Sequence, residues 1–287
     1  MTEDWENGGF GIYIHWPFCT AKCPYCDFNS HVRSNINQKQ WLKAYLNEIK
    51  RVSEKTSNRI LNSVFFGGGT PSLIEPSIIG DVLNEIQKHW KTKNNFEVTL
   101  EANPGSVDAK NFKAYKEAGV NRTSMGIQSL NTKDLKALGR THTVEEALAA
   151  FEIARQNFKA VSFDLIYARQ NQNISQWEKE LSLALSLEAS HMSLYQLTIE
   201  QGTAFGDRYN RGLLKGLPND DTSADMYDLT LSLCEDRGLV SYEVSNYAHQ
   251  GYESIHNLIY WRYGDYIGIG PGAHGRLTID GKKYATE

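Results

Sequence analysis

Short apolar runs rich in β-branched residues alternate with longer segments of helical periodicity along most of the chain. The apolar runs lie at residues 11–15, 63–66, 97–101, 122–127, 161–167 and 192–199, and their length and composition predict strands. The segments that follow them carry apolar residues at three- and four-residue spacing, which predicts helices over 38–54, 76–90, 108–118, 132–138 with 144–157, 174–187 and 221–237. Asp108 and Ser175 are typical of helix starts, and Gly119 and Gly238 are typical of helix ends.

Six successive strand–helix units predict an α/β fold with a parallel sheet and right-handed crossovers, either doubly wound or curled into a barrel. In both arrangements ligands collect at the carboxyl ends of the strands. Several motifs follow strand ends here: a cysteine triplet after the first strand, residues 67–72 after the second, Glu101 at the end of the third and Gln128 at the end of the fourth. The sequence therefore predicts that these motifs converge on one site.

The triplet Cys19, Cys23 and Cys26 has a CxxxCxxC spacing. Three thiolates this close in sequence can hold three irons of a [4Fe-4S] cluster and leave the fourth iron open to an exchangeable ligand. A structural zinc site is the alternative, because His15 and His31 flank the triplet and could complete four ligands. A set of structural disulfides is a less satisfactory explanation of the cysteine spacing, since four cysteines are too few to stabilise a chain of 287 residues by disulfides.

Composition and charge narrow the function classes. The chain is 40% hydrophobic and 22% charged, as in ordinary globular domains, and its net charge of -4 argues against a general nucleic-acid binder. No apolar stretch reaches the length of a membrane span, and the polar, acidic N-terminus is unlike a signal peptide. Clustered thiols without a signal peptide predict a reducing, cytoplasmic location.

Seven stretches of the chain carry a family resemblance: Tyr-Ile-His-Trp-Pro-Phe-Cys, the cysteine triplet, Phe-Phe-Gly-Gly-Gly-Thr-Pro-Ser, Leu-Glu-Ala-Asn-Pro-Gly, Met-Gly-Ile-Gln-Ser-Leu, Leu-Gly-Arg-Thr-His and Phe-Asp-Leu-Ile-Tyr. With them the chain resembles the radical S-adenosylmethionine (SAM) superfamily, and more closely its group of coproporphyrinogen dehydrogenases and HemW-type haem chaperones. The resemblance runs from about residue 11 to 275 and implies a partial TIM-like (β/α)6 barrel. It also implies a cluster at the open top of the barrel, with SAM on the open iron.

The resemblance also sets expected domain bounds. Members of the group usually continue into a C-terminal helical domain, which this chain is expected to lack. We expect an N-terminal tail at 1–10, the partial barrel at 11–240, and the truncated start of a C-terminal extension at 241–287.

Several polar and glycine positions are candidate ligand contacts. From the residues alone, glycines at 67–69 would let backbone N–H groups approach a carboxylate or phosphate, although a tight turn would use them equally. The resemblance implies SAM contacts at Tyr13, Tyr25, Gly68, Gly69, Thr70 and Glu101. It further matches Gln128, Arg140 and Asp164 to positions that bind a second SAM in the coproporphyrinogen enzymes.

Two features favour the haem chaperones within this group. Phe28 stands where the coproporphyrinogen dehydrogenases carry a fourth cysteine, and His-Asn-Leu-Ile-Tyr-Trp at 256–261 matches the HNxxYW motif of the HemW type. The resemblance implies a haem contact at His256, supported by Asn257, Tyr260 and Trp261. Taken alone, the motif is also explained by a histidine and two aromatic residues that close the bottom of the barrel. One departure is the run 168–171, Ala-Arg-Gln-Asn, where the group has a Gly-Leu-Pro-Gly-like turn.

The sequence thus predicts a haem-binding chaperone with a SAM-coordinated [4Fe-4S] cluster. Its expected partners are haem, an unidentified haem-acceptor protein and an electron donor, with no nucleic acid and no membrane span. The alternative is an oxygen-independent coproporphyrinogen III dehydrogenase that decarboxylates propionates by radical chemistry. A structural iron–sulfur or zinc protein without turnover is the third hypothesis, and whether the chain is an enzyme stays open at this point.

Overall fold

The computed structural model describes residues 4–287, with the side chains of residues 4 and 106–109 outside the description. Six parallel strands form the centre of its sheet: β1 Phe10–Trp16, β4 Ile60–Gly68, β5 Lys91–Ala102, β6 Arg122–Gln128, β7 Ala160–Tyr167 and β8 His191–Gln196. They match the six predicted strands. On one side β11 Asp265–Ile269 adds to β1 in parallel, followed by the antiparallel strands β12 Gly275–Ile279 and β13 Lys282–Thr286. On the other side lie β10 Asn246–Ala248 and β9 Val240–Ser241, both antiparallel.

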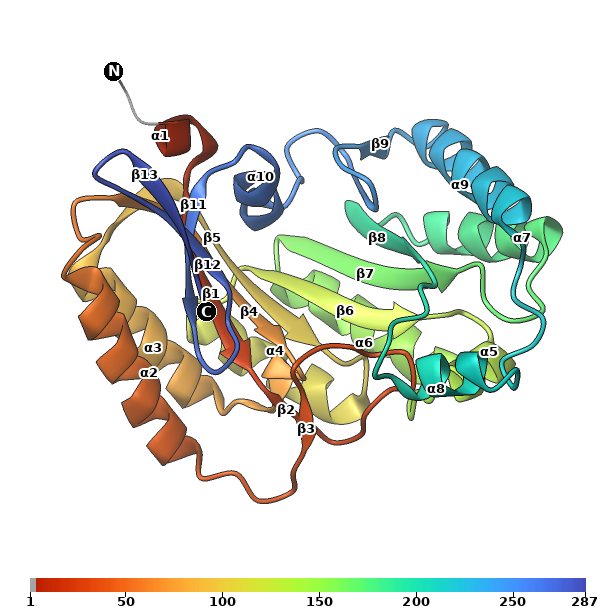
Figure 1. The fold of residues 1–287 in the computed structure, drawn as a ribbon, viewed down its shortest axis with the longest axis horizontal. Helices are drawn as coiled ribbons and strands as arrows, with labels where there is room; N and C mark the ends of the chain where they lie inside the picture. Colours follow the sequence, from red (N-terminus) through yellow and green to blue (C-terminus); the bar gives the residue numbers. More distant parts are fainter. Residues whose placement is uncertain (1–3) are drawn as a thin grey trace.

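The strand order is β13-β12-β11-β1-β4-β5-β6-β7-β8-β10-β9, and the two edges do not pair with each other among the described strands. The fold is therefore an α/β fold whose mostly parallel sheet is not closed, as the expected partial barrel requires (Figure 1). A separate short pair, β2 Phe18–Cys19 and β3 His31–Val32, lies beyond the end of β1.

Helices connect the strands. They are α1 Asp4–Gly8, α2 Gln38–Ser53, the 3-10 turn η1 Pro71–Leu73, α3 Pro76–His89, α4 Ser106–Glu117, α5 Thr132–Ala137, α6 Val144–Asn157, α7 Ile174–Leu185, α8 Ala204–Asn210, α9 Asp220–Glu235 and α10 Ile255–Trp261. These bounds confirm the helices predicted from periodicity. The longer helices cover the outer face of the sheet, and α1, α8 and α10 lie at its ends (Figure 1).

The helix ends follow local sequence. A capping box between Asn173 and Gln176 starts α7, so the predicted start at Ser175 lies inside the helix. The helix predicted to start at Asp108 is α4, which begins at Ser106. The side chain of Asp108 is not among those that the structure describes. Gly119 follows α4 with φ +113° and Gly238 follows α9 with φ +73°. Both glycines take the left-handed conformation that ends helices, as predicted.

Alternation along the strands divides the molecule into an apolar layer and a polar interior. Phe10, Ile12, Ile14 and Trp16 of β1 are fully buried on the side that faces the helices. The intervening positions face the concave side of the sheet, where buried residues are unusually polar: Ser63, Glu97, Thr99, Arg122, Ser162, His191 and Ser193. Buried polar groups need hydrogen-bond partners, so this interior forms a connected polar network rather than a second apolar core.

Residues beyond 240 do not form a separate layer. Because β10 pairs with β8 and β11 pairs with β1, the predicted division at residue 240 cuts through one sheet. The predicted hairpin is present as β12 and β13, with Leu277 opposite Tyr284. No described helix is both long and apolar enough to cross a membrane.

A buried ion pair joins this last segment to the start of β4. Arg59 Nη1 lies 2.5 Å from Asp265 Oδ2, both side chains are buried, and Thr278 Oγ1 donates to Asp265 Oδ1 at 3.0 Å. The guanidinium also lies over the ring of Trp5, 4.2 Å from its centroid. The pair therefore connects the first helix, β4, β11 and β12.

We expect Asp265→Asn to lower the free energy of unfolding by about 3–5 kcal/mol, because it leaves a buried guanidinium without its counter-charge. The exposed pair of Arg51 and Glu48 provides a control, since Arg51→Ala should change stability by less than about 1 kcal/mol. Urea denaturation of both variants measures the difference. Equal, small effects would show that Asp265 does not hold the C-terminal strands.

Candidate functional site

The loop 17–31, which carries the cysteine triplet, is fixed at its ends and near its middle. His31 N donates to Pro17 O at 2.7 Å, where β2 and β3 pair. Phe205 N, in α8, donates to Pro24 O at 2.8 Å. A loop tied to the barrel in this way can hold its thiols in a defined arrangement.

A cavity of about 710 Å³ opens where the parallel strands end, next to this loop. Its volume lies within the range of roughly 300–1,000 Å³ that is usual for small-molecule sites. Side chains or backbone from β4, β5, β6, β7 and β8 line it. The structure brings together these predicted residues: Cys19, Cys23, Cys26, Tyr25, Gly68, Gly69, Thr70, Glu101, Gln128, Arg140 and Asp164.

The three thiols border this cavity from one side. Cys19 is buried, and Cys23 and Cys26 are half-buried. Across the described residues, no three His, Cys, Asp or Glu side chains converge as ligands of a single metal ion would. His15, a candidate fourth zinc ligand, uses both ring nitrogens within the protein, on a tyrosine hydroxyl at 3.0 Å and a backbone carbonyl at 2.9 Å. Because each cysteine of a [4Fe-4S] cluster binds a different iron, three thiols that border one cavity without converging on a single point fit the cluster better than a zinc ion.

The glycine-rich segment after β4 is built differently from the prediction. Gly68 N donates to Glu101 Oε2 at 3.1 Å, and the N–H groups of Gly69 and Thr70 donate to backbone carbonyls of β1 and β2 at 2.7 and 2.8 Å. These three N–H groups are therefore used inside the protein and do not point freely at a ligand. Gly68 has φ +116°, and a Cβ there would lie 2.6 Å from the ring of His15. The absence of a Cβ at Gly68 and Gly69 lets His15 and the backbone of Phe18 pack closely against this segment, and the backbone of both glycines lines the cavity.

Two carboxyl groups, Glu101 at the end of β5 and Asp164 in β7, face the same cavity. Burial, and secondly the charge of Asp164, raises the pKa of Glu101 from 4.5 to about 8. Burial also raises the pKa of Asp164 to about 6, although Ser124 Oγ donates to its Oδ1 at 3.1 Å. Two carboxylates in a poorly hydrated space oppose each other's ionisation, and a cationic ligand would relieve this. The pair therefore favours a positively charged ligand.

Arg140 and Gln128 complete the polar wall. Arg140 Nη1 donates to Cys23 Sγ at 3.2 Å, and its Nη2 donates to Asn103 Oδ1 and to Gly126 O, both at 2.8 Å. Arg140 Nε and Gln128 Oε1 are buried without a hydrogen-bond partner. Orphaned polar atoms on a cavity wall are those that a bound ligand or water would satisfy.

Tyr13 is the predicted SAM contact that does not line the cavity. Its ring stacks against Phe65 with 6.2 Å between centroids, and its hydroxyl lies 3.0 Å from His15 Nδ1. Burial, followed by the charge of Glu101, raises the pKa of the Tyr13 phenol well above its usual value. Tyr13 thus belongs to the barrel interior beneath the cavity.

The HNxxYW motif lies at the opposite end of the barrel, because α10 sits near the start of β1 (Figure 1). His256 is 1% exposed; its Nδ1 lies 2.8 Å from Ser63 Oγ and its Nε2 lies 2.8 Å from Tyr260 OH. Burial lowers its pKa to about 3, so the ring is neutral. Asn257 Nδ2 donates to Tyr242 OH at 3.1 Å.

In this structure His256 closes the bottom of the barrel, as the structural alternative for the motif expects. The two ends of the motif differ in exposure: His256 is buried, whereas Trp261 is 57% exposed. A haem contact at His256 stays a prediction, and ligation of the iron requires one ring nitrogen to leave its present partner, Ser63 Oγ or Tyr260 OH.

Sequence reasoning missed many residues of the cavity wall, among them the polar residues Asn103, Ser124 and Tyr195. Asn103 is two residues after the predicted site residue Glu101, and Ser124 is four residues before the predicted site residue Gln128. Side chains an even number of residues apart on a strand point to the same face of the sheet. Period-two alternation at the strand ends was the available signal.

The unusual turn after β7 does not reach into the cavity. Ala168 and Asn171 have φ of +55° and +59°, and Arg169 is buried where its guanidinium contacts Glu180 and, at 2.8 Å, Asp134 Oδ2. This arginine ties the turn to α5 and α7 on the outer side. The orientation of Asp164 is therefore set by its neighbours on the sheet.

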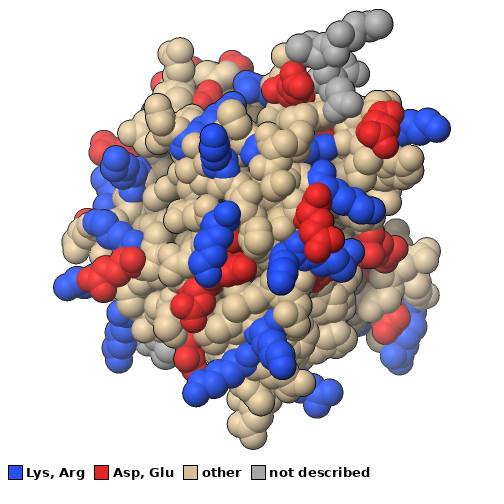
Figure 2. Space-filling model, turned by 90° about the vertical axis from the view of Figure 1, so that its left-hand side faces the viewer, with Lys and Arg blue, Asp and Glu red and all other residues tan. Residues whose placement is uncertain are grey.

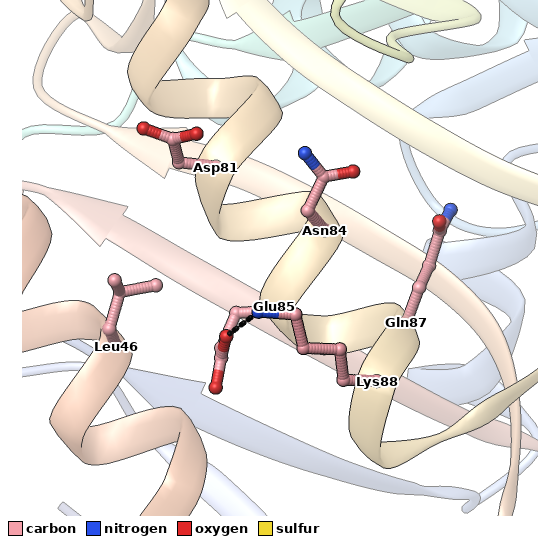
Figure 3. Close-up of a pocket in the computed structure, with 6 residues that line it drawn as sticks. All are labelled: Leu46, Asp81, Asn84, Glu85, Gln87 and Lys88. Atoms are coloured by element: carbon pink, nitrogen blue, oxygen red, sulfur yellow. Dashed lines mark hydrogen bonds and ion pairs between the residues drawn. The ribbon is translucent and has the colours of Figure 1, made fainter.

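A second hollow lies on the outer face, between α2 and α3, and is lined by Leu46, Asp81, Asn84, Glu85, Gln87 and Lys88 (Figure 3). Glu85 is already paired with Lys88 at 2.8 Å, and none of the predicted site residues lines this groove. On this side of the molecule basic and acidic side chains are interspersed (Figure 2). The hollow therefore lacks the convergent, unsatisfied polar groups of the cavity at the strand ends.

Comparison with known proteins defines the class first. The sequence profile of the radical SAM superfamily matches residues 13–184. Among solved structures, coproporphyrinogen III oxidase (HemN) from Escherichia coli, described as a radical SAM enzyme, superposes with a TM-score of 0.79. That likeness covers 93% of this chain and 64% of HemN at 21% identity, a level that shows the fold alone.

Curated relatives define the family. The heme chaperone HemW of Haemophilus influenzae is 43% identical over 274 residues, which is 93% of this chain and 70% of HemW. HemW of Escherichia coli is 40% identical, over 94% of this chain and 71% of the relative. Radical S-adenosyl methionine domain-containing protein 1, mitochondrial, of Danio rerio is 41% identical, over 94% of this chain and 61% of the relative. The chain belongs to the radical SAM superfamily and, within it, to the HemW family. It spans between 61% and 71% of the length of these three relatives.

The raised pKa of Glu101 predicts an unusual pH dependence of stability. The folded state holds this proton up to about pH 8, whereas the unfolded state loses it near pH 4.5. The folded state therefore binds more protons in that window, and stability falls as pH rises through it. We expect Glu101→Gln to stabilise the cluster-free protein near about pH 9, relative to wild type, by more than it does near about pH 5.

Urea denaturation across this pH range measures the effect. Glu178→Gln on the exposed side of α7 is the matched control and should follow the wild-type profile. A constant difference between Glu101→Gln and wild type at all pH values would contradict a proton held by Glu101.

Proposed function

We propose that this chain is a haem-binding chaperone that holds a [4Fe-4S] cluster with SAM and passes haem to an acceptor protein. The observation that carries the proposal is the identity of 40–43% to proteins named heme chaperone HemW over 93–94% of the chain. The cavity at the strand ends supports it, because the predicted cofactor residues gather there. Since the relatives are longer than this chain, the activity of the whole protein is part of the proposal.

The cluster would be held by Cys19, Cys23 and Cys26, whose thiols border the cavity. When bound, the cluster supplies one-electron chemistry and an iron that is open to an exchangeable ligand. Within the loop 17–31, Cys19 is buried, whereas Cys23 and Cys26 are half-buried. An electron donor and a cytoplasmic, reducing location are parts of the same proposal.

SAM would occupy the remaining cavity. Glu101 and Asp164 suit its sulfonium and amine groups, because a cation stabilises both carboxylates. Arg140 and Gln128 offer polar atoms on the same wall, two of them unsatisfied. The backbone of the segment after β4 and the phenol of Tyr25 would border the ligand. Tyr13 would support this wall from below rather than contact SAM.

Haem would bind at the far end of the barrel, on α10. Trp261 and Tyr263 are both 57% exposed and lie at and just beyond the end of this helix. Exposed aromatic side chains can stack on a porphyrin face. His256 would serve as an axial ligand only after one ring nitrogen leaves its partner, Ser63 or Tyr260, and its buried ring becomes accessible, so haem binding would open the bottom of the barrel.

Because the proposed cluster site and the proposed haem site lie at opposite ends of the barrel, loss of the cluster should not abolish haem binding. Replacing any one of the three cluster cysteines by alanine should abolish the cluster and leave haem binding measurable. Cys234→Ala is the matched control, because Cys234 is buried in α9 away from the cavity. Iron and sulfide content reports the cluster, and Soret absorbance in an anaerobic titration reports haem. Loss of haem binding in all three cysteine variants, with Cys234→Ala unaffected, would argue against two sites.

Two variants on α10 test the haem site itself. We expect Trp261→Ala to weaken haem binding with a small change in stability, since its side chain is exposed. We expect His256→Ala to lower stability by about 1–3 kcal/mol, because it leaves buried partners unsatisfied, and to change the Soret spectrum. Saturable haem binding that neither substitution alters would remove α10 from the proposal.

A further inference from the structure

We propose that Arg140 is a positioning residue that sets the reduction potential of the cluster by donating a hydrogen bond to the sulfur of Cys23. The inference rests on the proposed function, because it takes the cysteine triplet to hold a [4Fe-4S] cluster. It concerns the protein without SAM, and so differs from the role in SAM binding that the family resemblance implies for this residue.

The geometry fixes the guanidinium against one ligand sulfur. Arg140 follows α5, and its Nη1 lies 3.2 Å from Cys23 Sγ. Its Nη2 is held at the same time by Asn103 Oδ1 and Gly126 O, both at 2.8 Å. These two acceptors come from the ends of β5 and β6, so the sheet itself aims the donor at the sulfur.

The charge of Arg140 lacks the usual partner. No carboxylate of the described residues lies within ion-pair distance of its guanidinium, and its Nε is buried without a partner. An arginine side chain stays protonated in proteins, and a buried charge without a counter-charge is unfavourable. Its hydrogen-bond partners are Asn103, Gly126, Cys23 and the phenol of Tyr25. A phenol is neutral at about pH 7, so among these partners the cysteine is the one that carries a negative charge when it binds iron. The thiolate of a cluster-bound Cys23 therefore supplies the missing counter-charge.

This contact acts on the redox equilibrium. Reduction adds one electron to the cluster, and a fixed positive charge and an N–H···S bond stabilise the more negative state. The low dielectric of a buried wall strengthens both effects. Arg140 should thus raise the potential and make the cluster easier to reduce by a one-electron donor.

The test uses the cluster-loaded protein without SAM, titrated anaerobically with dithionite and followed by electron paramagnetic resonance. In Arg140→Gln the ratio of reduced to oxidised cluster at a fixed potential should fall about tenfold, which is about 59 mV for a one-electron couple. Arg140→Lys keeps the charge but lacks the planar fork whose two nitrogens hold Cys23 on one side and Asn103 with Gly126 on the other, and should give a smaller fall. Lys22→Gln removes a positive charge from the same cavity, where Lys22 is exposed and is not hydrogen-bonded to a cysteine sulfur. It should shift the ratio much less than Arg140→Gln.

Iron and sulfide analysis separates the two proposals. Absence of a cluster in the wild-type protein would overturn the proposed function. A wild-type cluster whose potential is the same in Arg140→Gln, or shifts only as much as in Lys22→Gln, would overturn the role of Arg140 alone. Where Arg140→Gln fails to hold a cluster, an unchanged potential in Arg140→Lys overturns that role as well.

Discussion

Parallel pairing of the six central strands is the constraint on which the rest of the structure depends. It brings the carboxyl ends of β4 to β8 to one edge, where residues far apart in sequence line a single cavity. It also directs every second side chain of each strand to the concave side. Burying polar residues at those positions is tolerated because they form hydrogen bonds with one another. His191 Nδ1 and Ser162 Oγ, for example, are 2.9 Å apart.

The polar interior has two ends with different chemistry. At the carboxyl end, the carboxyl groups of Glu101 and Asp164 have raised pKa values, and two polar atoms of the wall are unsatisfied. At the amino end, α10 closes the barrel with His256, whose ring nitrogens both have partners. Unsatisfied polar atoms thus face the open cavity at the carboxyl end, whereas the ring of His256 at the amino end is fully hydrogen-bonded within the protein. This contrast is the physical reason to propose the cofactors at the strand ends and to expect haem to rearrange or overlie α10.

The two ends are connected through β1. The ring of Tyr13 lies near that of His256, with 6.5 Å between centroids, and its hydroxyl contacts His15, which in turn bonds the backbone of Asn29 in the cysteine loop. Asn29 Nδ2 also donates to Pro271 O at 2.9 Å, so the segment after β11 supports the same loop. Residues beyond 240 are therefore part of the site's support, which a domain boundary at that position would obscure.

The hydrophobic pattern alone was enough to predict the six central strands and the helices between them, because period-two and helical spacing are local properties of the chain. The sequence also predicted that the motifs after the strands would meet, since parallel strands share one edge. Eleven of the predicted site residues do line the cavity. How these residues are used depends on their three-dimensional neighbours: the glycine N–H groups bond within the protein, Tyr13 lies beneath the wall, and Arg140 donates to a cysteine sulfur. The tertiary structure also decided that His256 is buried at the far end, because helix placement and hydrogen-bond partners depend on contacts between segments that no local pattern encodes.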